Sequence, residues 1–220
     1  MKKTGLFLLL LLCVLCTHAQ LKLTTTGGIS YTIGNKPDSL FFAKKTGSNL
    51  QLNAAYYWGR LALGLKLGTA KYKPTANLTN ITPPNLPNRL SATANGIRNT
   101  YFLLGPEICL CYRQIKIMPN IKLGIMHTVA DSTIIKLESI NGTPRKYSTG
   151  LANANSFAYN VGVNIAVKIS NTIGIATNLD YMAYKLNATL TDTRSSTNPT
   201  LPINQPRQYF NAGLGIYVTF

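Results

Sequence analysis

Acidic residues are scarce in this chain, which holds 6 Asp and Glu against 22 Lys and Arg, for a formal net charge of +16. A basic protein that binds nucleic acid gathers its positive charge on one helix or in a recognised module. Here the basic residues are scattered along the sequence. We therefore expect no nucleic-acid partner, and we expect the charge to meet anionic lipid phosphates instead.

Cysteine and histidine are also scarce, and beyond residue 19 only Cys109, Cys111 and His127 remain. Two cysteines that lie two residues apart on one strand face are poorly placed to bridge each other. The chain therefore lacks the disulfide framework of a small secreted scaffold. A metal site would need further soft ligands, which only Met118 and Met126 could supply. We interpret the cysteines as filler and expect no metal and no cofactor.

Long apolar runs are absent after residue 19, where none approaches the roughly 20 residues of a membrane-spanning helix. The N-terminus, MKKTGLFLLLLLCVLCTHAQ, has a basic start, an apolar stretch over 6–16 and small residues before Gln20. This three-part layout predicts a secretory signal peptide over 1–19, cut after Ala19. We expect residues 20–220 to form one domain.

Strict alternation of apolar and polar residues is what the chain has in abundance. Val161, Val163 and Ile165 alternate with Gly162 and Asn164, and such a period of two predicts β-strands. Eight strands are predicted, at about 21–34, 48–58, 61–72, 98–112, 115–128, 156–169, 173–186 and 207–220.

Three tight turns provide an independent check on these strands. They lie at 59–60, 113–114 and 170–172, and in each hairpin apolar residues face apolar ones and polar residues face polar ones. A slip of one residue would exchange the two faces, so the registers are well specified. The predicted pairs include Trp58 with Leu61, Tyr56 with Leu63, Asn53 with Lys66, Glu107 with Asn120, and Asn164 with Asn178.

The other four connections, at about 35–47, 73–97, 129–155 and 187–206, are long and rich in Pro, Asn, Thr and Ser. We expect no packed structure in them. Short and long connections therefore alternate around an even number of strands. This pattern predicts an all-β fold, a closed antiparallel eight-stranded barrel in a bacterial outer membrane, with the termini in the periplasm and the long loops outside.

The two faces of the strands differ in the size and polarity of their side chains. One face carries large apolar residues, while the other is mostly Gly, Ala, Asn, Thr and isolated charges. A soluble ligand-carrying barrel needs an apolar interior. Because the small, polar face could not build a dry core, we expect the apolar face to point outward into lipid. Pro106 and Pro119 fall on that face, where local bulges would accommodate them.

The last strand reads RQYFNAGLGIYVTF and places Leu214, Ile216, Val218 and Phe220 on one face. This ending, the signal peptide before Gln20 and the eight-strand layout resemble the small outer-membrane β-barrel proteins of Bacteroidota called PorT-like. The architecture is also similar to OmpX and the OmpA membrane domain. The resemblance implies that those four residues are the signal that the barrel assembly machinery reads. Some PorT-like members act in secretion, which makes an accessory secretion role an alternative.

Several charged residues are predicted to face the lumen. A buried carboxylate among lysines could be a functional site. However, side chains fill an eight-stranded barrel, so we interpret these charges as a structural plug and expect no diffusion pore. The predicted members are Glu107, Lys122, Lys66, Lys116, Lys168 and Asp180.

His127 carries the remaining catalytic alternative. It lies on the outward face near the loops, the height at which barrel enzymes that trim lipid A place a histidine and a serine. Their serine follows two residues later, where this chain has Val129. A nucleophile must contact its base, so we expect no enzyme.

The expected function is therefore that of a non-enzymatic surface protein. Loops 73–97 and 129–155 would support the envelope or bind a protein or glycan partner. Basic residues in or beside the loops would contact lipid and lipopolysaccharide phosphates; they are Lys71, Lys73, Arg89, Arg145, Lys146, Lys185, Arg194 and Arg207.

Overall fold

The computed structural model describes residues 19–33, 42–75, 89–94, 96–130, 133–138, 145–151, 154–192 and 200–220. Except for Ala19, the predicted signal peptide lies outside these residues. Within them, no helix is long and apolar enough to cross a membrane.

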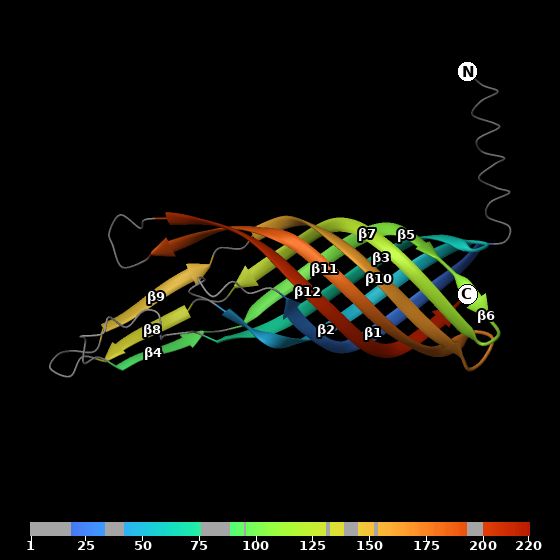
Figure 1. Cartoon of the computed structure of the whole chain (residues 1–220), viewed down its shortest axis with the longest axis horizontal. Helices are drawn as coiled ribbons and strands as arrows, with labels where there is room; N and C mark the ends of the chain where they lie inside the picture. The colour runs from blue at the N-terminus through green and yellow to red at the C-terminus, as the bar shows by residue number, and fades with distance from the viewer. Residues whose placement is uncertain are drawn as a thin grey trace, which may run out of the picture.

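Eight long antiparallel strands close into a barrel (Figure 1). Around the barrel the order is β10-β7-β5-β3-β2-β1-β12-β11, and the pairing of β10 with β11 closes it. A short strand β6 (Leu110–Tyr112) follows β5 and also pairs with β7. The barrel strands are β1 (Ala19–Ile33), β2 (Phe42–Trp58), β3 (Leu61–Thr75), β5 (Ile97–Ile108), β7 (Ile115–Ala130), β10 (Ala154–Lys168), β11 (Ile173–Asp192) and β12 (Thr200–Thr219). The predicted fold class is confirmed.

The three tight turns and the C-terminal Phe220 lie at one end of the barrel, which we call the turn end, and the opposite end is the loop end (Figure 1). All three predicted registers are confirmed, including Asn53 opposite Lys66 and Glu107 opposite Asn120. Gly59 has a φ of 68°, and Arg113 in the second turn has a φ of 52°. Such left-handed conformations match two-residue hairpin turns to the twist of the strands.

The two prolines within strands do not shift the ladders in which they lie. Pro106 is opposite Leu63, and Pro119 is opposite Val163, each within a continuous register. The ladder between β5 and β7 is interrupted between Leu104 and Glu107, but its register is the same on both sides of the gap. The bulges that the sequence suggested are therefore absent from these two ladders. Both prolines lie on the exposed outward face, as predicted.

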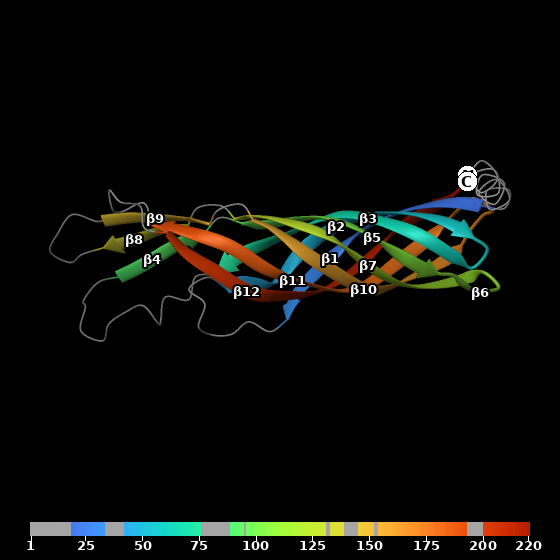
Figure 2. The same cartoon turned by 90° about the horizontal axis from the view of Figure 1, so that it is seen from above.

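The loop end holds more structure than the sequence predicted. Three further strands, β4 (Arg89–Ala94), β8 (Thr133–Glu138) and β9 (Arg145–Leu151), form a sheet beyond the barrel (Figures 1 and 2). We call these three strands the extension. The expectation that 73–97 and 129–155 hold no packed structure is therefore wrong for these segments.

The physical reason is that β11 is longer than its neighbour β10. The last pair between the two strands is Ala158 with Tyr184, but β11 continues to Asp192. The part of β11 beyond β10 pairs with β9. In turn, β9 pairs with β8, and β8 pairs with β4. The segment 187–206 was also expected to be a loop, yet β11 and β12 pair as far as Thr191 with Thr200.

The barrel is polar inside and apolar outside. Large outward side chains are exposed, for example Leu214 at 65% and Ile125 at 58%, whereas Lys66 and Lys122 are fully buried. Among the outward side chains that the structure describes on the eight strands, the charged ones are Lys71, Arg98 and Lys185, all at the loop end. An uncharged apolar band between polar ends is the surface of a barrel that spans lipid.

Candidate functional site

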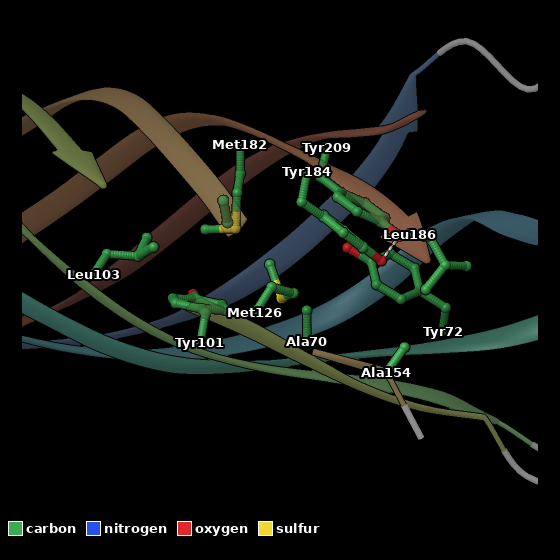
Figure 3. Close-up of a cluster of buried hydrophobic side chains, with 11 residues drawn as sticks. Ala70, Tyr72, Tyr101, Leu103, Met126, Ala154, Met182, Tyr184, Leu186 and Tyr209 are labelled. Carbon is green, nitrogen blue, oxygen red and sulfur yellow. Dashed lines mark hydrogen bonds between the residues drawn. The ribbon is translucent and has the colours of Figure 1, made fainter. Parts of the chain in front are cut away.

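The lumen is filled by three layers of side chains. An apolar layer at the turn end contains Ala55, Tyr57, Ala62, Cys109, Met118, Ala166, Ala176 and Tyr217. A larger apolar layer at the loop end includes Tyr72, Tyr101, Leu103, Met126, Met182, Tyr184, Leu186 and Tyr209 (Figure 3). Charged and amide side chains lie between them, and we call this middle set the charged layer.

Glu107 on β5 is the centre of one half of the charged layer. Its Oε2 accepts hydrogen bonds from Lys122 Nζ at 3.1 Å and from Asn53 Nδ2 at 3.3 Å. Asn164 Nδ2 donates to the same oxygen at 3.4 Å, and the Tyr57 hydroxyl donates to Oε1. The carboxylate is thus held by one ammonium and three neutral donors.

Asp180 on β11 is the centre of the other half. Its Oδ1 accepts from Lys66 Nζ at 2.7 Å, and its Oδ2 accepts from Asn178 Nδ2 at 2.8 Å. Lys66 also donates to Asn160 Oδ1 at 2.9 Å. Lys66 lies on β3, which is the fourth strand from β11 in either direction around the barrel. This ion pair therefore crosses the lumen.

The charged layer holds two carboxylates and two ammonium groups, none of them more than 1% exposed. Lys22, whose Nζ lies 2.8 Å from Met118 Sδ in the turn-end layer, is a third buried ammonium group in the lumen. Buried ions are tolerated only when they are paired and hydrogen-bonded. Because both apolar layers and the charged layer are buried, the interior is closed, as expected for a barrel of eight strands. Lys116 is only half-buried and Lys168 is exposed, so these two predicted members lie outside the charged layer.

Sequence reasoning missed the tyrosines at the loop end. Tyr184 and Tyr209 are stacked with ring centroids 5.8 Å apart, and Tyr72 lies 4.9 Å from Tyr209 (Figure 3). The Tyr72 hydroxyl is hydrogen-bonded to Ser30, which also donates to Asn211. Along their strands these tyrosines alternate in step with the lumen charges, so they point inward as well. The same alternation in the sequence could have identified them. They close the lumen at the loop end.

His127 is half-buried on the outward face, and its Nδ1 lies 2.6 Å from Asn155 Oδ1. Thr100 is the residue opposite His127 on β5. Asp131 and Ser132, which follow on the same segment, lie outside the described residues. In the part of the chain that the structure describes, His127 is hydrogen-bonded to an amide, and no group of three His, Cys, Asp or Glu could hold a metal ion.

The C-terminal residues lie on the outward face of β12, and Phe220 is at the turn end. Phe220 is 70% exposed, and its backbone N–H donates to the Leu21 carbonyl oxygen at 2.8 Å. Leu214 and Ile216 are also exposed, while Val218 is half-buried. This bond attaches the last residue to β1, which closes the barrel beside β12.

No protein-family model and no curated protein matches the sequence. Among solved structures, the chain is similar to a major outer membrane protein from Thermus thermophilus, with a TM-score of 0.56 and 12% identity, covering 92% of this chain and 100% of that one. OprG from Pseudomonas aeruginosa matches with a TM-score of 0.52 and 10% identity, covering 92% and 96%.

The outer membrane protease OmpT from Escherichia coli matches less well, with a TM-score of 0.46 and 12% identity, covering 92% of this chain and 96% of that one. At such low identities the first two likenesses show the fold alone, and they support an outer-membrane location. The narrower resemblance to PorT-like proteins stays a prediction. The chain therefore has the fold of the small outer-membrane β-barrels.

Proposed function

We propose that the protein is a non-enzymatic bacterial outer-membrane barrel whose extension binds a partner at the cell surface. The observation that carries this proposal is the sheet of β4, β8 and β9, which lies beyond the barrel at the loop end (Figure 2). The proposal places the turn end in the periplasm after removal of residues 1–19. The closed lumen supports a binding role over a diffusion role.

Removing the extension tests this proposal. A variant in which short Gly-Ser linkers replace 76–95 and 131–153 keeps all eight barrel strands, because β5 resumes at Ile97 and β10 at Ala154. We expect it to fold and to lose the binding of intact cells to purified envelope glycans and surface proteins. Cell binding assays on the two strains measure this. Equal binding by the folded variant and the parent would contradict the proposal.

Anionic lipid is the second partner that the structure supports. Lys71 and Arg98 lie directly opposite each other on β3 and β5, both exposed and just beyond the apolar band. Two like charges in that position repel each other unless an anion lies between them. Phosphate groups of lipopolysaccharide would supply that anion at the outer rim of the barrel.

The double variant Lys71→Ala/Arg98→Ala is expected to weaken lipopolysaccharide binding about tenfold or more, since each basic residue near an anionic surface contributes about 1 kcal/mol. Titration of the detergent-solubilised protein with lipopolysaccharide measures the change. Arg60→Ala is the control, because Arg60 is exposed in a turn at the opposite end. If both variants bind equally, the lipid contact is not at this rim.

Phe220, Val218, Ile216 and Leu214 serve as an assembly signal in this proposal. Deleting Phe220 removes one backbone hydrogen bond and leaves the β1–β12 register from Lys22 onward unchanged. We expect several-fold less protein in the outer membrane of cells, but normal folding of the purified chain into detergent. Membrane fractionation and refolding yields measure the two effects. A parallel loss of refolding would mean that Phe220 is structural.

A role as an accessory component of a secretion system rests on the resemblance to PorT-like proteins alone. Normal secretion after deletion of the gene would remove it. A lipid A-modifying activity would need a nucleophile in contact with His127, and the contact that the structure describes is with Asn155.

A further inference from the structure

The two cysteines beyond residue 19 are in contact at the turn end. Cys109 Sγ lies 2.9 Å from Cys111 Sγ, and both thiols are free. The sequence placed both cysteines on one strand face, and the structure adds that their two thiols are in contact. The reason is a break in the strand, since β5 ends at Ile108 and β6 begins at Leu110.

The two thiols differ in accessibility. Cys109 is 7% exposed and packs in the turn-end layer with Met118 and Tyr217, whereas Cys111 is exposed. Cys111 is opposite Lys116 on β7, and Arg113 lies in the adjacent turn. Positive charge beside an accessible thiol attracts anionic reagents to it.

A structural disulfide does not explain the pair. A disulfide stabilises mainly by closing a long loop in the unfolded chain. A bridge between Cys109 and Cys111 would enclose a single residue, Leu110. Such a bridge would add little stability, and short or exposed bridges of this kind are the ones that exchange.

A soft metal ion is also a poor explanation. The nearest additional sulfur in the same layer is that of Met118, and Lys22 Nζ lies 2.8 Å from its Sδ. The same ammonium lies 4.5 Å from the centroid of the Tyr217 ring. A cation already occupies the position that a metal bound by Met118 would need.

We propose that Cys109 and Cys111 form a redox-active dithiol at the turn end of the barrel. The Cys111 thiolate attacks one sulfur of a small anionic disulfide such as oxidised glutathione, forming a mixed disulfide and releasing one thiolate. Cys109 then loses its proton, and its sulfur attacks Cys111 Sγ, which closes the intramolecular disulfide and releases the second thiolate. Two electrons pass from the cysteine pair to the oxidant, and the two cysteine protons end on the released thiols.

The test uses the processed protein, purified in detergent, reduced and then incubated with oxidised glutathione. After addition of N-ethylmaleimide, intact mass spectrometry is expected to show a chain lighter by two hydrogen atoms, with no maleimide and no glutathione attached. Cys109→Ser is expected to stop at a stable glutathione adduct on Cys111. Cys111→Ser should react at least about tenfold more slowly, because its remaining thiol is buried.

The result for the wild-type chain alone decides whether the proposal is right. The test therefore remains valid even if one of the variants fails to fold. Two maleimides on the wild-type chain after exposure to oxidised glutathione would overturn it. A wild-type chain that keeps one glutathione would also overturn it, since Cys109 would then have failed to resolve the mixed disulfide.

Discussion

Replacing Asp180 with Asn is expected to lower the free energy of unfolding of the barrel by about 3–5 kcal/mol, which is the typical effect of removing one partner of a buried ion pair. The change leaves the Lys66 ammonium in the lumen without a carboxylate, hydrogen-bonded to the amide oxygen of Asn160. Lys66→Met should cost a similar amount, because it leaves Asp180 without its ammonium partner. The double variant should lose much less free energy of unfolding than the two single variants lose together, since it leaves no unpaired charge.

Urea unfolding in lipid vesicles measures these changes, and Trp58, the single tryptophan of the chain, reports on them by fluorescence. Lys185→Met is the matched control for Lys66→Met. Lys185 is exposed on the outward face of β11, so its loss should change stability by no more than about 0.5 kcal/mol. If Asp180→Asn lowered the free energy of unfolding no more than Lys185→Met does, the charged layer would not be a structural plug.

A charge placed in the apolar band should cause the second largest loss in the free energy of unfolding. Ile121 lies midway along β7, is 55% exposed and points outward. Ile121→Arg is expected to cost about 2–4 kcal/mol, the range for an arginine at the midplane of a lipid-facing strand.

Thr46→Arg is the matched control for position in the band. Thr46 is an exposed residue of β2, opposite Tyr31 toward the loop end. The same substitution there should cost about 0–1 kcal/mol, because the cost falls toward the interfaces. Unfolding in vesicles measures both. Equal costs at the two positions would contradict the assignment of the outward face to lipid.

Local features of the sequence were sufficient for the hairpins. The turn at 59–60 places Asn53 opposite Lys66 because side chains alternate with a period of two, and no distant contact is needed to derive it. The same reasoning correctly placed Glu107 opposite Asn120. The inward face of each strand followed from the same parity, but the predicted list of lumen charges left out Lys22, which is buried.

The alternation of side chains could not show how far along the barrel axis a residue lies, nor which residue it meets across the lumen. Lys116 and Lys168 share the inward parity of Lys66, yet they lie near the turn end, where the barrel opens to solvent. The ion pair of Lys66 with Asp180 joins residues 114 positions apart. It depends on how the closed barrel brings β3 opposite β11.

The sequence by itself determined the strand faces, the three tight registers and the expectation of a barrel in lipid, because each depends on neighbours within a few residues. Only the tertiary structure decided the pairing of the buried charges, the tyrosines that close the loop end, the contact of Cys109 with Cys111 and the extension. The extension shows the reason most clearly. Its strands pair across long separations and at an edge that exists only because β11 is longer than β10.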